Sequence, residues 1–105
     1  MTALVVLTNV PDRTAAEKLA RDLVDRRLAA CVNVLAPCRS VYRWEGAVQE
    51  DEEVPLLIKT TRVRYPALEA AIREAHPNEL PEIVAVPIES GLAAYLEWVS
   101  AETTP

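Results

Sequence analysis

The sequence predicts a single α+β domain with the element order β-α-β-β-α-β, followed by a terminal helix. Two observations lead to this prediction. Short runs of β-forming apolar residues alternate with segments whose apolar residues recur every three or four positions. A chain of 105 residues also has room for only one hydrophobic core, so we treat residues 1–105 as one domain. This element order is that of the ferredoxin-like, split βαβ fold, in which the first and third strands are central.

The first two elements are a strand and an amphipathic helix. Residues 3–9 form a nearly unbroken apolar run, which is typical of a central strand covered on both faces. Pro11 ends the strand, and Thr14 and Glu17 have the spacing of a capping box that starts a helix. Apolar residues at three- and four-residue steps then predict the core face of this helix, made of Ala16, Leu19, Ala20, Leu23, Val24 and Leu28.

A long hairpin follows the first helix. Two extended segments, 31–44 and 47–61, flank the dipeptide Glu45-Gly46, where glycine can supply the positive φ of a tight turn. With this loop, Arg39 lies opposite Glu52. Pro37 and Pro55 fall at almost the same level, and both lack an amide donor, so we expect a bend or bulge there. Each arm exceeds the common strand length of about 5 to 6 residues, so the outer part of the hairpin needs another partner.

The second half of the chain repeats the alternation of helix and strand. The spacing of apolar residues predicts a helix over 66–76, because Pro77 disfavours helical geometry in the residue before it. Residues 83–88 form the last strand, and Pro87 places that strand at a sheet edge. A final helix starts near Ser90, with an apolar face made of Leu92, Tyr95, Leu96 and Val99.

Charge and composition exclude several classes of function. Eleven basic and sixteen acidic residues give a net charge of −5, which disfavours nucleic acid and anionic membranes as partners but not cations. Apolar stretches are shorter than the ~20 residues of a membrane span, and the N-terminus lacks the basic region of a signal peptide. We therefore expect a cytoplasmic protein. Eight prolines against two glycines also predict a thermostable protein.

A few side chains are candidates for metal chemistry. His76 is the only imidazole, and it is either a structural residue at a helix end or a ligand of a soft or borderline metal. The spacing of Cys31 and Cys38 matches neither a CxxC motif nor a disulfide framework, so we expect two thiols. The acidic run 50–53 is a solvated strand segment or, as a second interpretation, a hard-cation site.

Four further residues are candidates for a ligand pocket. Lys59 ends an apolar run, where its ammonium either pairs with a carboxylate such as Glu82 or extends to water. Tyr42 and Trp44 lie beside the hairpin turn, where the net charge favours interface or packing aromatics over base-stacking platforms. Neither a nucleophile elbow nor a glycine-rich phosphate loop is present, so we expect no enzyme.

Five motifs in order along the chain resemble the CutA divalent-cation tolerance proteins. They are residues 28–33 (LAACVN), 40–46 (SVYRWEG), 53–60 (EVPLLIKT), 76–77 with 81–83 (HP and PEI) and 95–98 (YLEW). The resemblance implies a ferredoxin-like subunit in a homotrimer like that of the PII regulators, and a role linked to copper and other divalent cations. Where relatives are proposed to bind copper through a cysteine and two histidines, this sequence has Thr8, Ala75 and His76. The resemblance therefore implies weak Cu(II) binding through His76 with oxygen donors.

Three classes of function follow in order of preference. The first is a homotrimeric protein that binds divalent cations. The second is a PII-like signalling module that binds a small ligand in clefts between subunits. The third is an enzyme that uses Lys59 and Glu82. Metal titration distinguishes the first class from the second.

Overall fold

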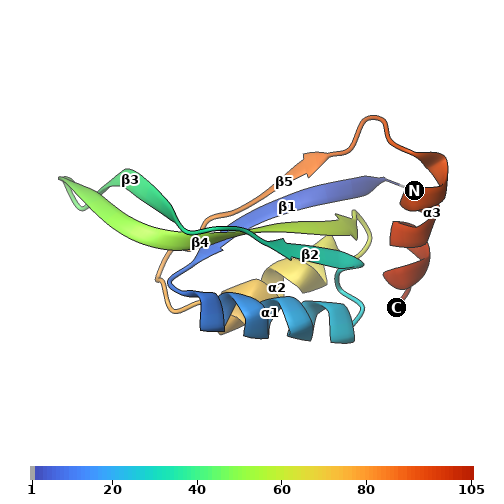
Figure 1. Cartoon of the computed structure of the whole chain (residues 1–105), viewed down its shortest axis with the longest axis horizontal. Helices are drawn as coiled ribbons and strands as arrows, with labels where there is room; N and C mark the ends of the chain where they lie inside the picture. Colours follow the sequence, from blue (N-terminus) through green and yellow to red (C-terminus); the bar gives the residue numbers. More distant parts are fainter. Residues whose placement is uncertain (1) are drawn as a thin grey trace.

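The computed structural model describes residues 2–105, so Met1, the first residue of the predicted domain, lies outside the described residues. Figure 1 shows one sheet with two helices beneath it and a third helix at one end. The elements are β1 (Ala3–Val10), α1 (Arg13–Asp25), β2 (Cys31–Val34), β3 (Cys38–Trp44), β4 (Ala47–Thr61), α2 (Tyr65–Ala75), β5 (Ile83–Pro87) and α3 (Ala93–Glu102). The predicted order of elements is confirmed, except that the second predicted strand is divided into β2 and β3.

The sheet is antiparallel throughout, with the strand order β2-β4-β1-β5, and β3 pairs with the outer half of β4. The first strand and the long strand of the hairpin are therefore central, as predicted. The edge position of β5 is also confirmed, and it suits Pro87, which has no amide proton to donate to a further strand.

The hairpin has the predicted register at its turn and a break in the middle. Arg39 lies opposite Glu52, as predicted from the two-residue loop. From Val34 to Cys38 the first arm has one residue more than β4 has between the partners of these two residues. This extra residue is the bulge predicted at the two prolines, and there the Leu35 amide donates to the Pro55 carbonyl at 3.0 Å.

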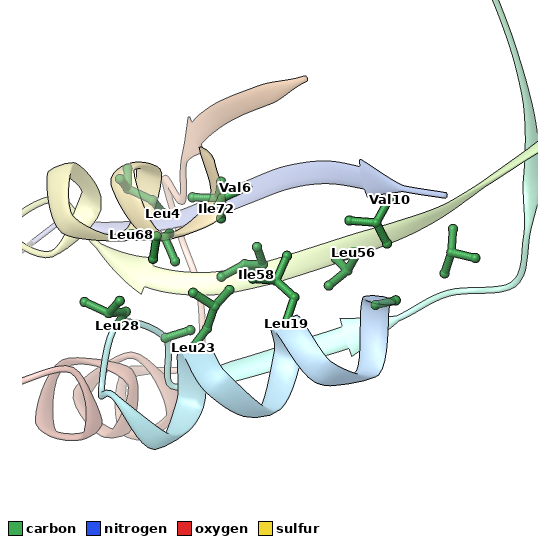
Figure 2. Close-up of a cluster of buried hydrophobic side chains, with 14 residues drawn as sticks. Leu4, Val6, Val10, Leu19, Leu23, Leu28, Leu56, Ile58, Leu68 and Ile72 are labelled. Carbon is green, nitrogen blue, oxygen red and sulfur yellow. The ribbon is translucent and has the colours of Figure 1, made fainter. Parts of the chain in front are cut away.

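The core lies between the sheet and helices α1 and α2 (Figure 2). Its largest fully buried side chains are those of Val6, Leu23, Leu56, Ile58, Leu68 and Ile72. The prediction that β1 is covered on both faces is wrong. Its even-numbered side chains face the helices and are buried, whereas Val5, Leu7 and Asn9 are half-buried on the opposite face. We call that opposite face the open face of the sheet.

Helix α1 begins one residue before the predicted capping box. Asp12 is the N-cap, and its Oδ1 accepts a hydrogen bond from the Ala15 amide at 2.8 Å. Thr14 is already inside the helix, and the Glu17 carboxylate lies 3.8 Å from the Arg13 guanidinium. The capping box at Thr14 is therefore wrong, because an aspartate two residues earlier supplies an equally good cap in extended backbone.

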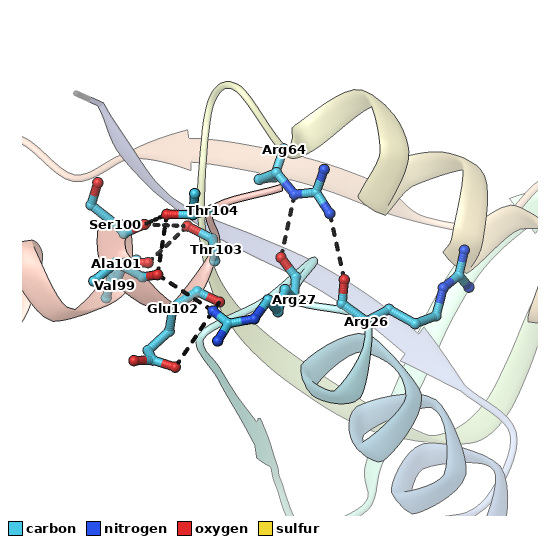
Figure 3. A network of polar contacts seen from close by, with 9 residues as sticks. All are labelled: Arg26, Arg27, Arg64, Val99, Ser100, Ala101, Glu102, Thr103 and Thr104. Atoms are coloured by element: carbon cyan, nitrogen blue, oxygen red, sulfur yellow. Dashed lines mark hydrogen bonds and ion pairs between the residues drawn. The ribbon is translucent and has the colours of Figure 1, made fainter.

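Helix α3 covers only one end of the sheet. Of the predicted apolar face only Val99 is buried, whereas Leu92 is 76% exposed. The helix is held by the network in Figure 3, in which the Arg27 guanidinium donates to the carbonyls of Ala101 and Glu102 at 3.5 and 3.4 Å. This cation at the C-terminal end of α3 is favourable, because the last carbonyls of a helix carry partial negative charge.

Among residues 2–105, no helix is both long enough and apolar enough to cross a membrane.

Candidate functional site

A groove of about 1030 Å³ separates the outer hairpin from the segment that links α2 to β5. Three of the four ligand-pocket candidates line it: Tyr42 and Trp44 from β3, and Glu82 from the linking segment. The long antiparallel arm brings the aromatic side chains over this segment, because β3 continues the hairpin beyond Ile83, where β5 begins. Lys59, the fourth candidate, does not line the groove.

The groove is acidic. Five carboxylates line it, and Arg43 is the only basic side chain among its lining residues; the carboxylates belong to Asp51, Glu52, Glu53, Glu79 and Glu82. The Tyr42 hydroxyl donates a hydrogen bond to Asp51 Oδ2. This hydrogen bond raises the pKa of Tyr42 above its ordinary value, with smaller contributions from burial and from the charge of Asp51. The surplus of negative charge favours cations, although solvent screens it.

Lys59 and Glu82 contact different partners. Glu82 Oε1 accepts a hydrogen bond from the side-chain nitrogen Nδ2 of Asn9 at 3.2 Å, whereas the Lys59 ammonium donates to the side-chain oxygen of Asn33. Lys59 lies on the open face between Cys31 of β2 and Val5 of β1. The two residues therefore do not pair, and the structure does not bring together the pair on which the enzyme interpretation rests.

His76 is the C-cap of α2 and is only 8% exposed. Its Nδ1 accepts a hydrogen bond from the Asn78 amide at 3.1 Å, so Nδ1 carries no proton in this arrangement. Its Nε2 lies 2.5 Å from the Asn9 carbonyl oxygen and acts as the donor to it. Both ring nitrogens therefore have partners within the chain, and the ring ties the end of α2 to the end of β1.

The three positions implied by the resemblance do not form a ligand set. Thr8 is 1% exposed, and its hydroxyl is buried without a hydrogen-bond partner in the described part of the chain. Ala75, the last residue of α2, has no donor atom in its side chain. Within residues 2–105 there is no group of three or more histidine, cysteine, aspartate or glutamate side chains placed to hold a metal ion.

One site residue that the sequence patterns did not indicate is Asn9. It contacts both Glu82 and His76, so it connects the groove wall to the histidine. A polar amide at the end of an otherwise apolar run was the available signal, since such a side chain needs a partner where the strand ends. Asn33 was missed in the same way, although its place on β2 opposite Leu57 brings it beside Lys59.

The family model described as CutA1 divalent ion tolerance protein matches residues 4–102. The chain belongs to the CutA1 family. It is 46% identical over 99 residues to the divalent-cation tolerance protein CutA of Thermus thermophilus, a match that covers 94% of this chain and 96% of that protein. It is 43% identical over 93 residues to human protein CutA, covering 89% of this chain and 52% of the human protein. The chain therefore spans about half the length of this human CutA1 relative.

Solved structures of CutA1 proteins have the same fold. The structure from Thermus thermophilus superposes with a TM-score of 0.95 at 45% identity, and the match covers 97% of this chain and 99% of that one. CutA1 from Oryza sativa gives a TM-score of 0.95 at 39% identity, covering 99% and 95% of the two chains. The resemblance stated from the sequence motifs and the predicted α+β fold are both confirmed.

Proposed function

We propose that this CutA1 family member contributes to divalent-cation tolerance as a homotrimer that binds Cu(II) weakly, without catalysing a reaction. The observation that carries the proposal is the membership of the CutA1 family over residues 4–102. The acidic groove supports cation binding, because its five carboxylates attract cations and repel anions. The ligand-sensing module is not proposed, since the family match favours cation tolerance.

The trimer is supported by surface that one chain leaves uncovered. Valines on the outer hairpin and on β5 are half or more exposed: Val41 by 62%, Val48 by 61%, Val84 by 50% and Val86 by 53%. The hairpin stretches the chain to 44 Å against 26 and 24 Å in the other directions. Exposed apolar strands of this kind are aggregation sites unless another chain covers them, and a closed cyclic assembly covers them without leaving a free edge.

Weak copper binding is proposed at Nδ1 of His76. A metal there must displace the Asn78 amide, whose hydrogen bond to Nδ1 is 3.1 Å long. The lost hydrogen bond opposes binding, and the remaining ligands must be carboxylates or water, because Thr8 and Ala75 provide no thiolate and no imidazole. Imidazole with oxygen donors still suits Cu(II), so binding remains but is weak.

Electron paramagnetic resonance of Cu(II) added to the intact protein tests this proposal. We expect nitrogen hyperfine splitting in the wild type and its loss in His76→Gln. Asn78→Pro, which removes the competing amide, is expected to tighten binding. Glu45→Gln, a charge change at the hairpin turn, is the matched control and leaves the nitrogen splitting unchanged. Cu(II) binding without nitrogen splitting in the wild type would move the site to the groove carboxylates, and no binding would remove the copper proposal.

We also propose a cytoplasmic location and a melting temperature above the mesophile range of about 45 to 65 °C. Relatives differ in location, since one is named chloroplastic in Arabidopsis thaliana and a structure from Archaeoglobus fulgidus is named periplasmic. Cell fractionation tests the location, and calorimetry at two protein concentrations tests the melting temperature.

A further inference from the structure

Helix α3 is attached to the rest of the chain by little buried surface. Helices α1 and α2 each bury three residues, whereas α3 buries only Val99 among its residues Ala93–Glu102. The core cluster of the described chain contains no residue of α3. The helix follows an exposed segment, 89–92, and within residues 2–105 no side chain caps its first turn at Leu92. A helix with so little buried apolar surface is expected to open before the core does.

Arg27 supplies the polar contacts that hold the C-terminal end of α3. Besides its hydrogen bonds to the carbonyls of Ala101 and Glu102, its guanidinium lies 3.8 Å from the Glu102 carboxylate (Figure 3). The hydroxyls of Thr61 and Thr103 are also close, at 3.5 Å, but the Thr103 hydroxyl already donates to a carbonyl within α3 at 2.7 Å. Arg27 is therefore the main polar connection between the end of α3 and the end of α1.

The backbone of Arg27 has an uncommon conformation for an arginine. Its φ is 57°, in the left-handed region that glycine and asparagine adopt more readily. Arg27 directly follows Arg26, the C-cap of α1, and glycine is the residue most often found at this position. Arg64, at the start of α2, donates to the carbonyls of Arg27 and Arg26 at 3.3 and 3.4 Å. The backbone alone therefore favours glycine here, whereas the contacts with α3 require the guanidinium.

We propose that α3 is a lid that opens from the end of the sheet while the core stays folded, and that Arg27 is the latch that holds it closed. Opening breaks the Arg27 contacts and withdraws Trp98 and Glu102 from a second cavity of about 350 Å³, whose other lining residues lie within 24–30. Helix α3 lies at the end of the sheet opposite the outer hairpin (Figure 1). The proposal concerns a movement within one chain and does not require a free face of the sheet.

Hydrogen–deuterium exchange of the intact protein, resolved by residue or peptide, tests the proposal. In the wild type we expect the amides of α3 to exchange about tenfold faster than those of α1. Arg27→Asn keeps a residue that tolerates the positive φ but removes the guanidinium, so we expect α3 to exchange about tenfold faster again, with α1 unchanged. Added salt is expected to accelerate exchange of α3 in the wild type but not in Arg27→Asn, because salt screens the contact with Glu102.

Two controls separate the latch from a general loss of stability. Arg26→Gln is the matched variant, because the Arg26 side chain pairs with Asp22 inside α1, and it is expected to leave the exchange of α3 unchanged. Chemical denaturation of Arg27→Asn is expected to give the unfolding midpoint of the wild type. The proposal is overturned if α3 exchanges as slowly as α1 in the wild type, if Arg27→Asn leaves α3 unchanged, or if this variant accelerates α1 and α3 equally.

Discussion

The two halves of β4 belong to one strand but lie in different surroundings. In the inner half, from Val54 to Thr61, buried and half-buried side chains alternate, because β1 and β2 flank the strand and two helices cover one face. In the outer half, from Ala47 to Glu52, every residue is exposed, and β3 is the only neighbour. β4 therefore keeps its pairing well beyond the core, and its uncovered half is the part available to other chains.

Truncating one side chain in each half of β4 is expected to change the free energy of unfolding in different ways, and this is the largest effect that we expect. Ile58 of the inner half is 0% exposed, so Ile58→Ala is expected to lower the free energy of unfolding by about 2–5 kcal/mol. Val48 of the outer half is 61% exposed, and Val48→Ala is expected to act through assembly. Denaturant unfolding at two protein concentrations checks both. A loss in Val48→Ala that does not depend on concentration would contradict the distinction.

A smaller effect tests the start of α1, which covers the inner half. Removing the Asp12 cap in Asp12→Ala is expected to cost about 1 kcal/mol, because the Ala15 amide loses its acceptor. Thr14→Ala is the control, since this hydroxyl has no capping role in the structure. Thermal unfolding of both variants decides between the two caps. If Thr14→Ala is the more damaging change, the capping box predicted from the sequence is restored.

The hairpin turn next to the outer half of β4 contains a residue whose replacement is expected to stabilise the protein. Glu45 has a φ of 50°, a region that asparagine tolerates better than glutamate, so Glu45→Asn is expected to stabilise the hairpin by about 0.5 kcal/mol. Gly46 has a φ of 82°, and a β-carbon added there would meet no atom within 4 Å, so Gly46→Ala should cost about 1 kcal/mol from backbone strain alone. Chemical denaturation measures both, and a Gly46→Ala variant as stable as wild type would contradict this turn geometry.

The smallest effect that we expect concerns the ionisation of Tyr42 in the outer part of the hairpin. The hydrogen bond to Asp51 raises the pKa of Tyr42, so the protonated phenol is favoured in the folded protein. Its stabilisation is present below the ordinary value of 10.0 and is lost as the pH rises through the raised pKa. Ultraviolet titration should find Tyr42 ionising above its ordinary pKa, and Asp51→Asn should lower that pKa. Tyr42→Phe identifies the signal, and an unchanged titration in Asp51→Asn would contradict the contact.

Local sequence predicted the features of the hairpin that local chemistry determines. A two-residue loop with glycine determines which residues pair near the turn, and two prolines at one level determine where the ladder breaks. The helix start was predicted wrongly because two caps lie two residues apart, and local chemistry permits both. The order of elements and the sheet topology were therefore predicted, whereas the cap, the open face of the sheet, the division between β2 and β3 and the exposed face of α3 were not.

The candidate site was predicted only in part, because its contacts join residues far apart in the chain. Tyr42, Trp44 and Glu82 do meet at one groove. His76 meets Asn9 across 67 positions, and Lys59 meets Asn33 across 26. Partners of this kind depend on the packing of α2 and on the register of β2, which no local pattern in the sequence determines.

We propose that other copies of the chain complete the outer half of the hairpin. Light scattering of the intact protein at micromolar concentration tests it most directly. We expect a mass of about three times the 11.6 kDa of one chain. In Val48→Glu, which places a charge on the exposed strand surface, we expect a smaller mass. A stable wild-type species with the mass of a single chain would contradict the proposal.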